Sequence, residues 1–223
     1  MTSRNECHID ICMSACVDAE FGYAQNNTLP WAIDEEYHLF LKFLASYPEG
    51  NSSVLIGRTS FELDAGKPGG CLYDLFGRYA KIMVISNSKT HEEDNIVYLP
   101  SIVGALAYLR THLNTIGNFQ PHRLFILGGG EIYKECFRLN LIDRLVISRL
   151  PTAYQCTHFI KWLPYELSVK MKLTNCATYD GFNIETYQKI PNITLTSESV
   201  TEGHPDKVSN YLLFHYLSVY DAI

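Results

Sequence analysis

A carboxylate among aromatic residues is the first candidate for chemistry in this sequence. Glu36 follows the motif Leu29-Pro30-Trp31 by five residues, and Phe40 follows Glu36 by four. If residues 34–44 are helical, Glu36 and Phe40 lie on one face. A carboxylate beside large apolar groups is costly to bury unless it has a function. The alternative is that Glu36 points to water and interacts with the helix dipole in the first turn.

A run of three glycines is the second candidate. Gly128, Gly129 and Gly130 separate the apolar stretch RLFIL from the periodic stretch EIYKECFRL. A strand that passes into a helix through glycines brings backbone N–H groups and the positive end of the helix together, which suits a phosphate or pyrophosphate. The run matches neither GxGxxG nor a Walker P-loop. A tight packing turn is therefore the alternative.

The third candidate is the segment IGRTSFE. Gly57 ends an apolar run and is followed by Arg58, Thr59 and Ser60. A cation and two hydroxyls at a corner between a strand and a helix suit a phosphate, whereas ordinary helix capping is the alternative. Arg78, in the segment LFGR, is by itself a surface cation.

The hydrophobic pattern predicts the elements that would position these residues. Strands and helices alternate as far as about Leu150, and the segment 167–190 then forms a hairpin around Asp180-Gly181. This order predicts an α/β fold with a mostly parallel sheet and an antiparallel edge. The predicted strands are 8–17, 52–57, 81–86, 95–100, 123–127 and 144–150, and the predicted helices are 34–47, capped by Asp34, 58–65, 101–114, capped by Ser101, and 131–139.

Composition excludes several classes of protein. The 223 residues are 47% hydrophobic and 19% charged, which suits one or two globular domains. A net charge of -6 argues against sequence-independent binding to nucleic acid. No apolar stretch is long enough to span a membrane. The seven cysteines show neither a CxxC pair nor zinc-ligand spacing, so we expect reduced thiols and a cytoplasmic location.

In their order along the chain, these motifs resemble dihydrofolate reductase over about residues 8–190. The motifs are LPW with Glu36 and Phe40, IGRTS, LFGR, KIMVIS, FILGGGEIY and THF at 157–159. The resemblance implies a central, mostly parallel sheet with helices on both faces. It also implies NADPH-dependent reduction of 7,8-dihydrofolate to tetrahydrofolate, by hydride transfer to pterin C6 and protonation at N5, within tetrahydrofolate biosynthesis and one-carbon metabolism.

The resemblance also implies roles for individual residues. Glu36 matches the carboxylate that binds the pterin and supports protonation of N5, and Trp31 matches the tryptophan that holds the water involved. Ser148 takes the place of a threonine that hydrogen-bonds the acid. The implied substrate-binding residues are Ala15, Leu29, Phe40, Leu75 and Arg78, with Arg78 for the glutamate α-carboxylate. The implied cofactor-binding residues are Ala15, Ala24, Gly57, Arg58, Thr59, Ser60, Ser86, Leu127, Gly128, Gly129, Gly130, Glu131, Ile132 and Tyr133, with a cis peptide between Gly128 and Gly129.

Departures from the family pattern keep an alternative open. Tyr23-Ala24 replaces Ile-Gly in the lid before LPW, and Cys156 replaces an acidic or glycine residue before THF. Asn87 stands where a cation often meets the 2′-phosphate, so NADPH is not assured over NADH. A catalytically weakened homologue that binds pterin or nucleotide, or a fusion scaffold, is the alternative. A related ribosylaminopyrimidine reductase is disfavoured, because that relative usually lacks the carboxylate that Glu36 supplies.

The last residues have a different character. TSESVTEGHPDKV at 196–208 resembles the N-terminal signature of S-adenosylmethionine synthetase, in which His204 and Asp206 would serve a triphosphate and magnesium. That enzyme needs three domains, so we expect no synthetase activity. We predict a reductase-like domain at 1–190 and a tail at 191–223, whose terminal helix at 205–223 docks on the domain or mediates self-association.

Overall fold

The computed structural model describes residues 7–117 and 120–191, which form a nine-stranded sheet and a two-stranded sheet. The strands of the larger sheet are β1 (Ile9–Val17), β3 (Ser52–Gly57), β4 (Ile82–Ile85), β5 (His91–Glu93), β6 (Ile96–Leu99), β7 (His122–Ile126), β8 (Arg144–Arg149), β10 (Met171–Tyr179) and β11 (Phe182–Lys189). The smaller sheet pairs β2 (Gly22–Ala24) with β9 (His158–Phe159).

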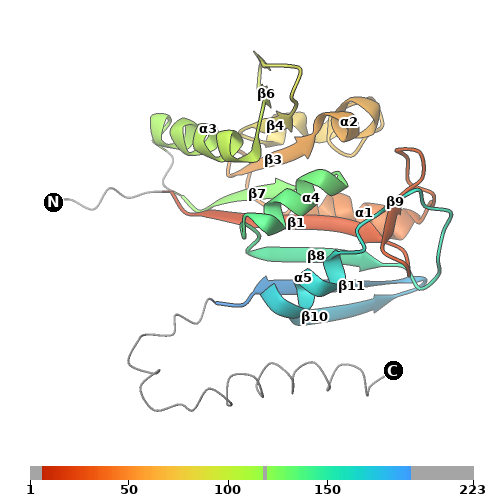
Figure 1. Ribbon diagram of the computed structural model, residues 1–223. Coiled ribbons are helices and arrows are strands. Elements are labelled where there is room, and N and C mark those ends of the chain that lie inside the picture. The colour runs from red at the N-terminus through yellow and green to blue at the C-terminus, as the bar shows by residue number, and fades with distance from the viewer. Residues whose placement is uncertain (1–6, 118–119, 192–223) are drawn as a thin grey trace, which may run out of the picture. The chain divides into compact units, whose positions relative to one another are not determined.

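The larger sheet has the order β10-β11-β8-β1-β7-β3-β4-β6-β5 (Figure 1). Its strands from β8 to β6 in this order pair in parallel. The outer strands β11, β10 and β5 pair antiparallel. The predicted α/β class, with a mostly parallel sheet and an antiparallel C-terminal edge, is therefore confirmed.

The helices begin close to where the sequence pattern places them. They are α1 (Asp34–Leu44), α2 (Arg58–Ser60) with the π-helical turn η1 (Phe61–Ala65), the 3-10 helix η2 (Tyr73–Arg78), α3 (Ile102–Thr115), α4 (Gly130–Arg138) and α5 (Leu163–Lys170). Ser101 caps α3, because its Oγ accepts the N–H of Gly104 at 3.1 Å. The prediction that Asp34 caps α1 is wrong, because the helix already begins at Asp34 and its N-cap residue is Ile33. The pattern also missed α5, η2 and the short strands β2, β5 and β9.

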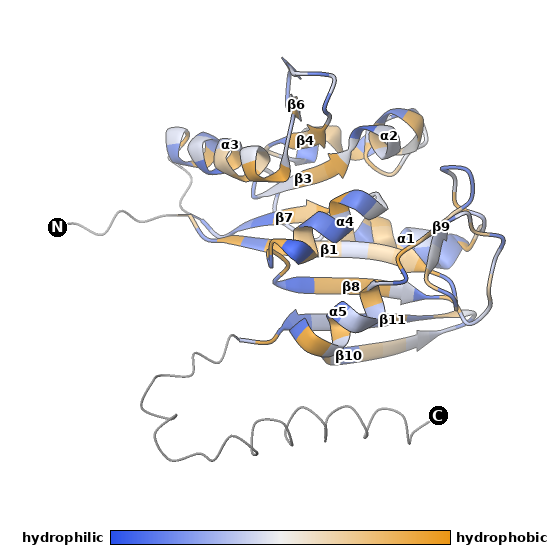
Figure 2. Ribbon diagram, in the orientation of Figure 1, coloured by the Kyte–Doolittle hydropathy of each residue, from blue (hydrophilic) through white to orange (hydrophobic). Residues whose placement is uncertain are grey.

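Alternation along the central strands divides the core between the two faces of the sheet. In β7, Leu124 and Ile126 point to the face that α3, α4 and α5 cover, whereas Phe125 points to the face that α1 and η1 cover. This period of two is the geometry of a strand that is buried on both sides. Apolar residues accordingly run through the central strands, as Figure 2 shows.

Strand order sets where a site can form. Parallel strands end at the same edge, so the residues that end or follow β1, β7, β3 and β4 form one row. Cys16, Leu127, Gly57 and Ser86 occupy this row in that order. From β1 to β4 there are three interstrand spacings, or about 14 Å. Ligands of α/β sheets bind at such carboxyl ends.

One prediction concerns the C-terminal tail, and another concerns segments that could cross a membrane. The predicted tail helix at 205–223, and its docking or self-association, lie outside the described residues and stay predictions. Within residues 7–117 and 120–191, no helix combines the length and apolar character that crossing a membrane requires.

Candidate active site

A cavity of about 1080 Å³ lies along the carboxyl edge of β1, β7, β3 and β4. Its wall is made by the ends of these strands together with α1, β2 and the first turns of α2 and α4. The structure thus brings most of the sequence-predicted residues to one place. Those that line the cavity are Ala15, Ala24, Leu29, Trp31, Glu36, Phe40, Gly57, Arg58, Thr59, Ser60, Ser86, Leu127, Gly129, Gly130, Glu131, Ile132 and Tyr133.

Glu36 is the buried acid of this cavity. It belongs to the first turn of α1, and only 8% of the residue is exposed. It therefore does not face water as the alternative supposed. Burial raises the pKa of Glu36, while hydrogen bonds from Ser148 and Cys16 oppose that rise by stabilising the carboxylate. The result is a carboxyl group that holds a proton to higher pH than an exposed glutamate.

Aromatic residues shield this acid from solvent. Trp31 is 8% exposed, and its ring meets the ring of Tyr154 edge-on with centroids 5.3 Å apart. Trp31 and Phe40 line the same cavity as Glu36. A flat, partly polar ring is the kind of ligand that such a site fits.

The glycine turn forms the middle of the cavity. The peptide bond between Gly128 and Gly129 is cis, as the resemblance implies. The carbonyl of Gly128 accepts the N–H of Gly57 at 2.6 Å, which joins the ends of β7 and β3. A Cβ on Gly130 would lie 2.6 Å from the Tyr23 hydroxyl, and one on Gly129 would lie 3.3 Å from Ser60 Oγ. Tyr23 therefore leaves no room for a side chain at Gly130, and Ser60 leaves little room for one at Gly129.

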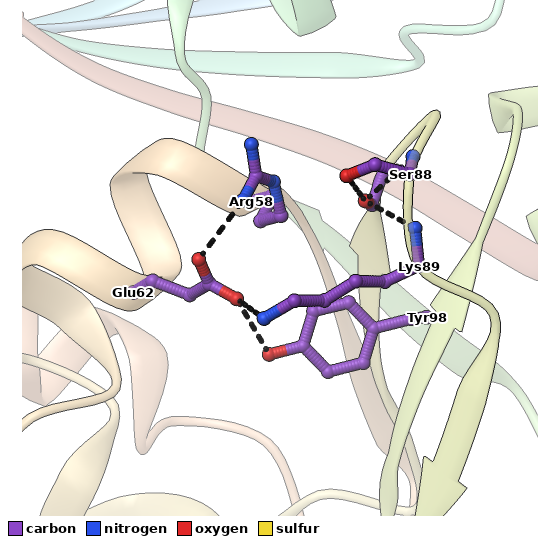
Figure 3. Close-up of polar contacts among 6 residues, drawn as sticks. Arg58, Glu62, Ser88, Lys89 and Tyr98 are labelled. Atoms are coloured by element: carbon purple, nitrogen blue, oxygen red, sulfur yellow. Dashed lines mark hydrogen bonds and ion pairs between the residues drawn. The ribbon is translucent and has the colours of Figure 1, made fainter.

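The far end of the cavity is polar. Ser86 Oγ accepts the N–H groups of Lys89 at 3.1 Å and Ser88 at 3.3 Å, which shapes the turn after β4. Arg58 pairs with Glu62 at 3.3 Å, and Lys89 hydrogen-bonds the other oxygen of the same carboxylate (Figure 3). The cations Arg58 and Lys89 and the hydroxyl of Ser86 thus lie near the end of β4, about three strands from the β1 end of the cavity, where Glu36 lies.

Four predicted residues do not line the cavity. Arg78, at the end of η2, donates from Nη2 to the carbonyls of Ala45 at 3.1 Å and Tyr47 at 3.3 Å, so it ties down the chain after α1. Leu75 is half-buried and packs against the core instead. Ser148, in β8, reaches the site only through its hydrogen bond to Glu36. Gly128 contributes its carbonyl to the bond with Gly57.

Sequence reasoning overlooked Cys16 and Asp18 at the site, and it noted Tyr23 only as a replacement in the lid. Cys16 lines the cavity and hydrogen-bonds Glu36, and burial raises the pKa of its thiol. Tyr23 accepts the N–H of Gly130 at 3.2 Å through its hydroxyl. Asp18 is fully buried, and its carboxylate accepts the N–H groups of Glu20, Gly22 and Tyr154, which fixes the turn before Tyr23. The sequence signal that could have indicated a site here is the group of polar residues that follows the apolar run of β1.

Known proteins resemble most of the chain. A dihydrofolate reductase of Candida albicans is 24% identical over 206 residues, which cover 90% of this chain and 93% of that protein. A dihydrofolate reductase of Saccharomyces cerevisiae is 25% identical over 141 residues, which cover 61% of this chain and 62% of that protein. The segregation and condensation protein A of Mycoplasmoides gallisepticum is 25% identical over 215 residues, or 93% of this chain. No protein-family model matches the chain.

The similarity to segregation and condensation protein A is confined to part of those proteins. The matched region is 31% of the length of the Mycoplasmoides gallisepticum protein and 24% of its counterpart in Mycoplasma pneumoniae. A solved structure gives the comparison of folds. Dihydrofolate reductase from Enterococcus faecalis, complexed with NADP(H) and RAB-propyl, superposes with a TM-score of 0.58 at 16% identity, over 81% of this chain and 96% of that one. The chain is therefore similar in sequence to dihydrofolate reductases and shares their fold.

Proposed function

We propose that this protein reduces 7,8-dihydrofolate to tetrahydrofolate with NADPH. The observation that carries the proposal is a buried carboxyl group, Glu36, in a cavity whose opposite end is polar and cationic. One end suits a pterin and the other suits the phosphates of a dinucleotide. The similarity to dihydrofolate reductases in sequence and fold supports the same reaction.

The residues present fit a dinucleotide. Gly129 and Gly130 line the cavity without side chains at the positive end of α4, where the Tyr23 hydroxyl accepts the N–H of Gly130. Thr59 and Ser60 line the cavity beside them, and Arg58 adds a positive charge. When bound, NADPH supplies the hydride. The residues of this chain would hold its pyrophosphate at the glycine turn and its adenosine at the turn after β4.

Glu36 would bind the pterin and control its proton. We infer that its carboxylate accepts hydrogen bonds from the pterin amino group and ring nitrogen. Its raised pKa lets it keep a proton to higher pH than an exposed glutamate, and Trp31 would hold the water that passes this proton to N5. Ser148 acts as a positioning residue, because it holds Glu36 without lining the cavity itself.

The first test removes the acid and keeps its shape. Glu36→Gln should lower kcat with dihydrofolate by about 100-fold or more, because general acid catalysis contributes that much. NADPH oxidation at 340 nm measures the rate, and fluorescence titration measures coenzyme binding. The exposed neighbour Glu35, changed to Gln, is the matched control and should leave kcat unchanged. Normal turnover by Glu36→Gln would contradict the assignment of the acid.

A second candidate, a weakened homologue that binds pterin or nucleotide, is favoured by one contact. The hydroxyl of Tyr23 occupies the Gly130 N–H that a coenzyme phosphate would use. A wild-type protein that binds NADPH and folate but shows no turnover would support this candidate over the reductase.

A further inference from the structure

The cation cluster beside the far end of the cavity contains its own anion. Arg58, at the start of α2, and Lys89, in the turn after β4, both direct their side chains to the carboxylate of Glu62 in η1 (Figure 3). The Tyr98 hydroxyl of β6 donates to the same carboxylate at 3.4 Å. A neighbour one helical turn away, Arg58, and two residues distant in sequence, Lys89 and Tyr98, therefore converge on Glu62.

Glu62 is charged in this cluster at neutral pH. The hydrogen bond from Lys89 is the main reason that the pKa of Glu62 lies below its usual range. Lys89 also contacts an aromatic ring, since its Nζ lies 5.4 Å from the centre of the Tyr98 ring. Both cations are thus partnered before any ligand arrives, and the three charges sum to +1 instead of +2.

A ligand phosphate at this corner would meet that carboxylate. A phosphomonoester carries a charge of about -1.5 to -2 at neutral pH. Arg58 and Ser88 line the cavity, and Lys89 and Glu62 stand directly beside them. To pair with either cation, the phosphate must displace Glu62 or approach it as a like charge. A dinucleotide without a phosphomonoester neither has to displace Glu62 nor is repelled by it at this corner.

We propose that Glu62 is the residue that sets coenzyme choice, by competing with the adenosine phosphomonoester of NADPH for Arg58 and Lys89. The inference rests on the proposed function, because it takes this corner as the adenosine end of the coenzyme site. Its consequence is that the protein discriminates only weakly between NADPH and NADH. Glu62 is a specificity residue and not a catalytic one, since it lies at the opposite end of the cavity from Glu36.

The test measures binding of two adenosine fragments, so that it does not depend on turnover. Full-length protein is titrated by calorimetry with adenosine 2′,5′-bisphosphate and with adenosine 5′-monophosphate. Glu62→Gln should bind the bisphosphate about tenfold more tightly than wild type, because a like charge a few ångströms away is removed. Its affinity for the monophosphate should stay within about twofold. The gain should shrink at high ionic strength, because these side chains are partly exposed.

Glu135→Gln is the matched control. Glu135 also pairs with an arginine, Arg138 of α4, at 2.7 Å, but it does not line the cavity. This control removes the same charge from the protein and should leave both affinities within about twofold. Lys89→Ala, which removes one of the two cations, should weaken bisphosphate binding and leave the monophosphate unchanged.

Each other result overturns the inference. Unchanged or weaker bisphosphate binding by Glu62→Gln would mean that Glu62 orients the cations for the phosphate instead of competing with it. Absence of binding by either fragment would mean that the corner holds no adenosine. A further outcome is that the variants show the expected changes in fragment affinity while the wild-type protein does not reduce dihydrofolate. That result would support the role of Glu62 and contradict the proposed reductase activity, so the two proposals can fail separately.

Discussion

At the scale of single residues, the site depends on one acid with neutral neighbours. Glu36 is buried beside a hydroxyl, Ser148, and a thiol, Cys16, and neither is charged at neutral pH. Burial raises the pKa of Glu36 and these two donors lower it. The balance between the two effects sets the pH range in which the acid carries its proton.

Removal of the Ser148 hydroxyl should move that range. The hydroxyl stabilises the ionised form of Glu36, so in Ser148→Ala the pKa of Glu36 should rise further. Turnover that needs protonated Glu36 falls as pH rises through this pKa, and we expect the fall to shift to higher pH. A profile of kcat against pH measures the shift. Ser168→Ala, on the exposed side of α5, is the control, and a shift to lower pH would contradict the prediction.

At the scale of elements, the contact between β2 and α4 covers the glycine turn. Tyr23 of β2 lies over Gly130, and its position depends on the pairing of β2 with β9 and on the buried Asp18. The ring of Tyr23 also meets that of His158 in β9, with centroids 6.0 Å apart. A small second sheet thus holds a hydroxyl over the start of a helix in the main domain.

Tyr23→Phe should bind NADPH about fivefold more tightly. A hydrogen bond of this kind is worth about 1 kcal/mol net, and the coenzyme no longer has to replace it. Quenching of intrinsic fluorescence measures the dissociation constant. Tyr165→Phe, at a site that is 62% exposed, should change nothing. Weaker binding by Tyr23→Phe would show that the hydroxyl helps to hold the coenzyme.

At the scale of the whole molecule, buried polar residues link the strands of the sheet. His122, the first residue of β7, is fully buried and bonds the Ser53 hydroxyl of β3 at 2.9 Å through Nε2. Burial lowers the pKa of His122 from 6.5 to about 4. The folded state therefore resists protonation of this ring, whereas the unfolded chain accepts the proton near pH 6.5.

This difference makes His122 a source of acid sensitivity. Its contribution to stability is fully present above pH 6.5 and is lost as pH falls toward 4, by about 3 kcal/mol in total. In urea unfolding, wild type should lose its advantage over His122→Gln across that pH window. The same change at the exposed His91 is the control. A difference between wild type and His122→Gln that does not vary with pH would contradict this assignment.

The local pattern of hydrophobic residues was sufficient to predict most of the fold. The apolar runs and their order predicted the parallel sheet, because strands buried on both faces need continuous apolar sequence. The positions of Glu36 and of the glycine turn also followed from local signals, since each lies at the start of a predicted helix. Short strands such as β2 and β9 were missed, because two or three residues carry no readable period.

Sequence alone therefore determined the α/β class, the glycine turn between β7 and α4, and the acid on α1, because each depends on neighbours within a few residues. Tertiary structure decided the rest. It turned Arg78 to the backbone carbonyls of Ala45 and Tyr47, and it joined Lys89 to Glu62 across 27 positions and Gly130 to Tyr23 across 107. The physical reason is that such contacts depend on which strands become neighbours in the sheet, and a local pattern of hydrophobic residues does not specify that order.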